Sequence, residues 1–373
     1  MIAAKTEQSF SRVLAGTALI FMVVLLAYVP AMKAGFIWDD DTMLIGNSIL
    51  QPNGLFKAWF TTETLNYWPV TSTSFWLEHK LWGLNPAGYH LVNILLHAGC
   101  AVLIWRILIR LGIPAALPSA LIFAVHPVNV ETVAWVTQRK TLLAMLFFLA
   151  SLVLYLRFDE SRKRRVFLWS VLFFALAVLS KGSVMALPVV ILLCVWWLRG
   201  RVQRLDVVRS LPYFGIAAIM SAVEIWFQYS RAGADVVRTD SFSGRLAGAG
   251  TAVWFYLFKA LVPASLTFVY PRWRIDPAQV ASWFPDLALM AVFGLGWRFR
   301  RSWGRPVLFA FGYTVLMLSP MLGFFNIYFM RYSLVADHYQ YASIIGIIAL
   351  VAAASTHWPR GGVLPHSNDR LQG

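Results

Sequence analysis

Apolar runs long enough to cross a membrane recur along the whole sequence, and this feature restricts the fold more than any other. The hydrocarbon core of a bilayer, about 30 Å thick, needs roughly 20 apolar residues per crossing helix. The 373 residues are 59% hydrophobic and only 13% charged, whereas about a quarter of a soluble domain is charged. Because backbone groups in hydrocarbon must pair internally, these runs predict an all-α polytopic membrane protein.

The positions of the spans follow from the apolar runs and the polar segments between them. We expect about ten transmembrane helices. The best delimited lie at about 13–32, 88–109, 114–125, 142–156, 211–229, 306–324 and 341–355, with two more spans forming a tight hairpin around Lys181. The run 246–266 is interpreted as re-entrant or interfacial, because a crossing there and another at 285–297 would place the arginines of 298–305 on the wrong side. The first run is longer than the apolar region of a cleavable signal peptide, so we interpret it as a retained signal anchor.

Basic residues fall in short loops between the apolar runs. The net charge of +15 is concentrated in three such segments, at 162–165, 199–209 and 298–305. The cytoplasmic loops of membrane proteins carry this excess of Lys and Arg. The pattern argues against nucleic-acid binding and predicts that these loops face the cytoplasm.

Residues 1–355 are predicted to form a single transmembrane domain. Its first outer loop, 39–86, is rich in Trp, Phe and Tyr, which favour the headgroup zone, so we expect short interfacial helices there. Residues 356–373 are polar and rich in Pro and Gly, and we expect this tail to be disordered.

Three consecutive carboxylates, Asp39, Asp40 and Asp41, follow the first apolar run in a chain with only 17 acidic residues. A charged group next to hydrocarbon is costly and is a functional hypothesis by default. A carboxylate within hydrogen-bond reach of an attacking hydroxyl can act as its general base. Helix-terminal or solvated carboxylates are the alternative interpretation.

The expected topology brings further polar side chains to the same side of the membrane. Cations among them would offset negative charge on a departing phosphate. The candidate substrate-binding residues are Asp41, His126, Glu131, Arg139, Lys140, Lys181, Arg331, Asp337, His338 and Tyr341. Each has a structural alternative, such as an internal ion pair, a hydrogen-bonded pair or an interfacial anchor. The histidines show no tight metal-ligand spacing, so we expect no metal site and no required cofactor, although a divalent cation stays an alternative.

Several motifs occur together in a fixed order. They lie at 36–41 (Phe-Ile-Trp-Asp-Asp-Asp), 67–71 (Tyr-Trp-Pro-Val-Thr), 88–97, 123–135, 179–181 (Leu-Ser-Lys) and 330–341. With these motifs the sequence resembles the multispanning half of the transmembrane O-mannosyltransferases that carry tetratricopeptide repeats, together with their bacterial relatives. The resemblance covers about residues 10–355 and implies a GT-C-type glycosyltransferase fold.

The resemblance also implies an activity and a location. It implies an enzyme of the bacterial inner membrane that takes a sugar from a polyprenyl-phosphate carrier on the periplasmic face. The sugar goes to a hydroxyl of a protein Ser or Thr, a glycan or a lipid, usually with inversion at the anomeric carbon.

The resemblance assigns roles to the matching positions. It makes Asp39 or Asp40 the catalytic base and leaves Asp41 as an additional acid. His338 stands where eukaryotic members have an arginine, so a cation there depends on protonated His338 or on Arg331. The groups expected at the carrier phosphate are Arg139, Lys181 and Arg331, and those expected to shape the site or bind the sugar are His126 and Glu131.

Relatives continue into tetratricopeptide repeats, whereas this sequence ends in a short polar tail. We therefore expect either that a partner protein supplies acceptor recognition or that this is a shortened member. Two other functions stay open. A transporter or flippase would need ionisable groups near mid-membrane and often an internal repeat, and no repeat is evident. A non-catalytic membrane scaffold would tolerate loss of both Asp39 and Asp40.

Overall fold

The computed structural model describes residues 10–64, 66–231 and 238–356, and every regular element within these ranges is helical. The all-α prediction is confirmed for this part of the chain. The predicted polar tail lies outside the described residues, except for Thr356.

The first helix, α1 (Phe10–Tyr28), gives way to a 3-10 helix at Val29–Lys33. Pro30 lies in the first turn of that 3-10 helix, and a proline inside an α-helix removes a backbone donor and clashes with the preceding turn. The apolar run predicted at 13–32 therefore forms an α-helix that ends early.

The first outer loop carries short helices, as predicted. They are a π-helical turn at Asp41–Ile45, a 3-10 turn at Ser48–Leu50, α2 (Gly54–Phe60) and α3 (Pro69–Trp82). The Trp59 Nε1–H donates to Thr73 Oγ1 at 2.9 Å, which ties α2 to α3. Their place at the bilayer surface stays a prediction.

The bundle that follows is built from the central helices of the chain. They are α4 (Pro86–Arg110), α5 (Ala116–Val125), α6 (Val130–Ala134), α7 (Arg139–Ser161), α8 (Arg164–Ser180), α9 (Leu187–Arg199) and α10 (Arg204–Arg231), with 3-10 turns at Pro127–Asn129, Val136–Gln138 and Gly182–Val184. In the core, α7 packs against α4 and α8. The Ser151 hydroxyl donates to the Ser170 carbonyl at 2.7 Å, and Ser170 returns the same bond, so α7 and α8 are joined through buried polar groups.

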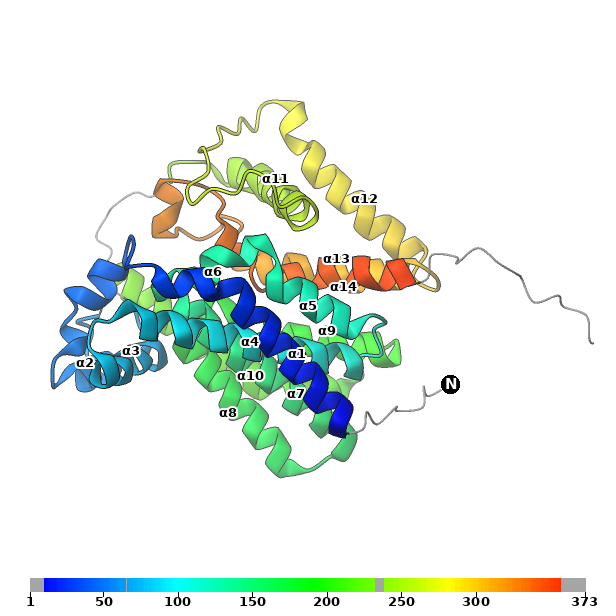
Figure 1. Cartoon of the computed structure of the whole chain (residues 1–373). Helices are drawn as coiled ribbons and strands as arrows, with labels where there is room; N and C mark the ends of the chain where they lie inside the picture. Colours follow the sequence, from blue (N-terminus) through cyan, green and yellow to red (C-terminus); the bar gives the residue numbers. More distant parts are fainter. Residues whose placement is uncertain (1–9, 65, 232–237, 357–373) are drawn as a thin grey trace, which may run out of the picture.

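The last third of the chain forms the upper part of the molecule in Figure 1, where α11 and α12 lie above α13 and α14. The elements are α11 (Phe242–Leu261), α12 (Phe284–Arg298), α13 (Gly304–Leu318) and α14 (Ile344–Thr356), with 3-10 turns at Val280–Trp283, Ser319–Met321, Tyr328–Arg331 and Asp337–Gln340. Gly346 lies against the Ala310 carbonyl and Thr314, where a Cβ would meet both at 2.7 Å. Glycine therefore permits the close packing of α13 on α14.

Six helices of the described residues are long and apolar enough to cross a membrane. A seventh candidate combines α5 with Pro127–Ala134, which are bent by 51° from each other. The multispanning prediction is confirmed, whereas the number ten stays a prediction. Residues 246–261 of the run interpreted as re-entrant lie in one continuous helix, α11, of 20 residues, and residues 262–266 follow its end. Its relation to the bilayer stays a prediction.

Candidate active site

The interruption between α5 and α7 builds one wall of the candidate site. The α-helix α5 ends at Val125, and Pro127 opens a 3-10 turn. The chain then passes through α6 before α7 begins at Arg139. Because of this break, the backbone N–H and the hydroxyl of Thr137 can bond to the first outer loop. In a continuous helix this N–H would bond within the helix instead.

Asp40 anchors the first outer loop to that wall. Its side chain is fully buried. One carboxylate oxygen accepts the Ile37 N–H at 2.9 Å, and the other accepts the Thr137 N–H at 2.9 Å. Burial raises the pKa of Asp40, and the two amide donors offset only part of that effect. Both oxygens of Asp40 therefore hold backbone in place.

Asp39 differs from Asp40 in exposure and partners. Its side chain is 29% exposed, with one oxygen 3.5 Å from the ammonium of Lys140. The other oxygen accepts the Thr137 hydroxyl at 2.6 Å. Asp41 is exposed at the start of the π-helical turn. Of the three acids, Asp39 thus combines an accessible carboxylate with a neighbouring cation.

Lys140 lies against two aromatic rings beside Asp39. Its ammonium lies 5.3 Å from the ring centroid of Trp68 and 5.4 Å from that of Trp135. A cation over the face of a tryptophan is attracted by the ring quadrupole. The aromatic side chains therefore fix the charge of Lys140 beside Asp39.

Lys181, at the tip of the hairpin between α8 and α9, lies in the same cluster. Its ammonium donates to Thr141 Oγ1 at 2.9 Å. Burial and then the charge of Lys140 lower the pKa of Lys181 to about 7. The carboxylates that oppose this shift are those of Glu224, Asp39 and Glu131. A lysine in this state gains its charge readily when an anion enters.

Glu224 was missed by the sequence interpretation. It projects from α10 and accepts the Gly182 N–H at 3.0 Å and the Trp68 Nε1–H at 3.3 Å. A Cβ at Gly182 would clash with this carboxylate, so a larger residue directly after Lys181 would displace the Glu224 side chain. The available signal was an acid inside an apolar span, which is a functional hypothesis by default.

Glu131 and His338 meet from segments far apart in sequence. The two carboxylate oxygens of Glu131 contact the His338 backbone N–H at 3.0 Å and its Nδ1 at 2.9 Å. Burial lowers the pKa of His338, and Glu131 opposes this only in part. Burial is therefore the larger influence on the pKa of His338, and its role as a cation stays a prediction.

Arg331 and Asp337 flank this pair. Arg331 is exposed at the end of the 3-10 turn at Tyr328–Arg331. The next residue, Tyr332, contacts Trp38 with ring centroids 5.6 Å apart, which brings this segment beside the triple aspartate. Asp337 accepts the Tyr270 hydroxyl at 2.9 Å, and burial raises its pKa to about 6.

Arg139 makes its contacts inside the protein. It is completely buried and forms an ion pair with Glu78 from α3. Its remaining donors reach Asn93 Oδ1 at 2.6 Å, Ser74 Oγ at 2.8 Å and the Tyr89 carbonyl at 2.9 Å. With its guanidinium enclosed in this way, Arg139 joins α3, α4 and α7 and has no donor directed at a carrier phosphate.

His126 and Tyr341 are also held in internal contacts rather than directed into the cluster. His126 is buried at the end of α5, with Nε2 3.1 Å from the Ala260 carbonyl of α11. The Tyr341 hydroxyl lies 2.8 Å from His97 Nδ1 in the core. Both predicted binding residues therefore connect helices here.

A metal centre was not expected from the sequence. Among residues 10–64, 66–231 and 238–356, no group of three or more His, Cys, Asp or Glu side chains could hold a metal ion.

The sequence is similar to known proteins over part of its length. A family model described as dolichyl-phosphate-mannose-protein mannosyltransferase matches residues 67–227. A protein O-mannosyl-transferase of Caenorhabditis elegans is 28% identical over 222 residues, which are 55% of this chain and 31% of the relative. Over these parts of its length the chain is similar to protein O-mannosyltransferases.

Two human proteins support the same relationship. Protein O-mannosyl-transferase TMTC3 of Homo sapiens is 32% identical over 37% of this chain and 16% of its own length. Protein O-mannosyl-transferase TMTC4 of Homo sapiens is 34% identical over 38% of this chain and 23% of its own length. The chain thus spans less than a third of each of these three relatives.

The matched segment can be compared with the candidate site. Residues 67–227 contain Glu131, Lys140, Lys181 and Glu224 but begin after Asp39. The family match therefore covers the lysine side of the cluster.

Proposed function

We propose that this chain is a GT-C-type membrane glycosyltransferase that moves a sugar from a polyprenyl-phosphate carrier to a hydroxyl acceptor. The observation that carries this proposal is the accessible carboxylate of Asp39, 3.5 Å from the Lys140 ammonium and supported by Thr137. A base for a hydroxyl and a cation for a phosphate are thus adjacent. The names of the relatives favour mannose as the sugar.

In the proposed reaction, Asp39 accepts the proton of the acceptor hydroxyl. The hydroxyl oxygen attacks the anomeric carbon from the side opposite the phosphate, so the new C–O bond forms with inversion. The bond between the anomeric carbon and the phosphate oxygen breaks, and its electron pair stays on the polyprenyl phosphate. Lys140 offsets the charge that develops on this leaving group.

Lys181 and Arg331 are proposed to complete the phosphate site. The pKa of Lys181 is about 7, and an anionic phosphate nearby would raise it by favouring the charged form. Binding of the carrier would therefore charge Lys181 where the charge is needed. We propose that the reaction requires no cofactor, because the side-chain cations stabilise the phosphate charge that a metal ion could otherwise stabilise.

The acceptor and location complete the proposal. The first loop and the lysine hairpin are proposed to face the periplasm of a bacterial inner membrane, opposite the basic loops. The acceptor is a hydroxyl of protein Ser or Thr, or of a glycan or lipid, and a partner protein is proposed to present it.

The test uses the full chain purified in detergent, with mannosyl-phosphoryl-polyprenol as donor and total membrane protein as acceptor. Covalent transfer should fall about 10²- to 10⁴-fold in Asp39→Asn, since general-base catalysis contributes that much. Glu63→Gln, which removes an exposed acid from the same first outer loop, serves as the matched control and should retain transfer. Full activity of folded Asp39→Asn would refute the assignment. Movement of the donor across vesicles without a covalent product would instead favour a flippase.

A further inference from the structure

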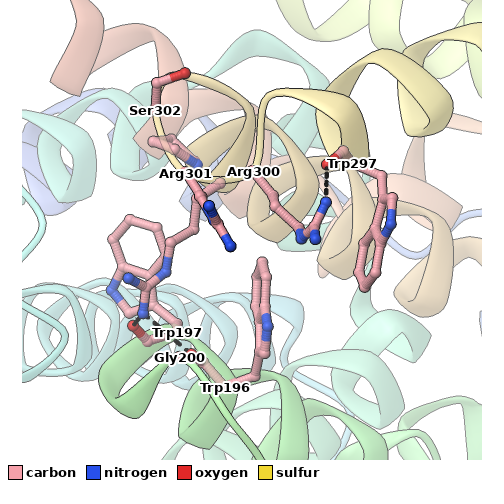
Figure 2. Close-up of a pocket in the computed structure, with 9 residues that line it drawn as sticks. Trp196, Trp197, Gly200, Trp297, Arg300, Arg301 and Ser302 are labelled. Carbon is pink, nitrogen blue, oxygen red and sulfur yellow. Dashed lines mark hydrogen bonds between the residues drawn. The ribbon is translucent and has the colours of Figure 1, made fainter.

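A cationic and aromatic cavity lies at the end of α9 away from the candidate site. It has a volume of about 630 Å³, and Figure 2 shows its lining side chains. The residues that line it are Trp196, Trp197, Gly200, Trp297, Arg300, Arg301, Ser302, Arg305 and Pro306. Because α9 has 13 residues at about 1.5 Å rise each, the helix separates this cavity from the Lys181 end by roughly 20 Å.

Two of the arginines are directed into the cavity. Figure 2 shows the guanidinium groups of Arg300 and Arg301 pointing from the turn between α12 and α13 toward the end of α9. Arg300 lies over the Trp297 ring at 4.7 Å and donates to the Trp297 carbonyl at 3.0 Å. The lining residues include no carboxylate, so no acidic side chain of the wall neutralises this charge.

Arg305, in the first turn of α13, joins α13 to the end of α9. Its Nη2 donates to the carbonyls of Trp196 and Trp197 at the end of α9. Its Nε is buried and, among the residues that the structure describes, has no hydrogen-bond partner. A buried unpaired donor is costly, and an oxygen of an anion in the cavity would satisfy it. The cavity thus combines guanidinium groups with an unused donor.

We propose that this cavity binds the phosphate headgroup of an anionic membrane phospholipid. Arginine guanidinium groups match phosphate oxygens in geometry and charge. Three tryptophans line the cavity, and tryptophan favours the headgroup level of a membrane. A lipid headgroup is therefore favoured over a phosphate dissolved in water. The bound lipid would hold the α12–α13 turn against α9 and so connect the upper helices to the bundle.

The test compares lipid binding by the full chain and by Arg300→Gln/Arg301→Gln. Native mass spectrometry would count phosphatidylglycerol or phosphatidylcholine molecules retained as detergent is removed. We expect preference for phosphatidylglycerol and a loss of affinity of about thirtyfold in the double variant, because each basic residue near an anionic lipid surface contributes roughly fivefold. Arg164→Gln/Arg204→Gln removes the same charge from exposed helix starts outside the cavity and should lower the affinity for phosphatidylglycerol less than the cavity variant does.

Three outcomes would overturn this proposal. These are equal retention of the two lipids by the wild-type chain, an equal loss in the control variant, and displacement of phosphatidylglycerol by millimolar inorganic phosphate. The last would identify a site for free phosphate. If the double variant fails to give a monodisperse protein, the single change Arg301→Gln keeps the test open, with about fivefold weaker binding expected.

Discussion

The substitution Asp40→Asn tests whether Asp40 anchors the backbone, in contrast to Asp39, the proposed base. In the native fold the two oxygens of Asp40 accept the Ile37 and Thr137 amides, each at 2.9 Å. Asparagine keeps one acceptor, and its amide nitrogen would face the second backbone N–H. One buried donor would then lose its partner, which costs roughly 1–3 kcal/mol.

The lost charge acts in the opposite direction. Burial raises the pKa of Asp40 above its ordinary value of 3.8, so the fold disfavours the charged carboxylate and a neutral asparagine removes that penalty. We therefore expect a net loss of about 1–2 kcal/mol in the free energy of unfolding at pH 7. Intrinsic tryptophan fluorescence during unfolding of the detergent-purified chain would measure it.

The pH dependence of this difference checks the physical cause. Because the folded pKa of Asp40 lies above its unfolded value, its protonation stabilises the fold below the unfolded value of 3.8, and this contribution disappears as pH rises through the folded value. Acidification should therefore widen the gap between the wild type and Asp40→Asn. Asp41→Asn should stay within about 0.5 kcal/mol of the wild type. Equal stability of Asp40→Asn and the wild type at pH 7, or a gap that narrows on acidification, would refute the reasoning.

Three further predictions concern the cations. Arg139→Ala should lower the free energy of unfolding by about 3–5 kcal/mol, because it leaves Glu78 buried without its partner, and Arg139→Met/Glu78→Leu should recover much of that loss in the same unfolding assay. The kcat/KM for transfer should decline as pH rises through about 7, where Lys181 loses its charge; in Lys181→Arg this decline should be absent, and an unchanged profile would count against a role for Lys181. Glu224→Gln should move the decline to lower pH, because the Glu224 charge raises the pKa of Lys181; a move to higher pH would contradict the arrangement.

The elements of the fold were largely predictable where apolar length alone decides. The run predicted at 88–109 forms α4 at Pro86–Arg110, and that predicted at 142–156 lies within α7 at Arg139–Ser161. The early start of α7 was not predictable from hydropathy, because Arg139 looks like a residue outside the membrane. Its charge is tolerated inside the helix since Glu78, from the first outer loop, neutralises it.

The candidate site was predictable in outline and not in its details. The sequence indicated a carboxylate and lysine cluster, and the structure brings Asp39, Lys140 and Lys181 together. The structure also adds Glu224 to the cluster. In the sequence, Glu224 stands out only as a single acid in an apolar span. Gly182 and Glu224 are 42 positions apart in the sequence. A contact over such a separation depends on how the helices pack.

The sequence by itself determined that this chain forms membrane-spanning helices with an acidic motif after the first, since apolar length and local polarity are properties of neighbouring residues. Only the tertiary structure distinguished the three aspartates. Asp40 is buried on two backbone amides, whereas Asp39 remains accessible beside Lys140. The physical reason is that the accessibility and charge environment of a carboxylate are set by the residues packed against it, and here these come from the α5–α7 break, about 100 positions further along the chain.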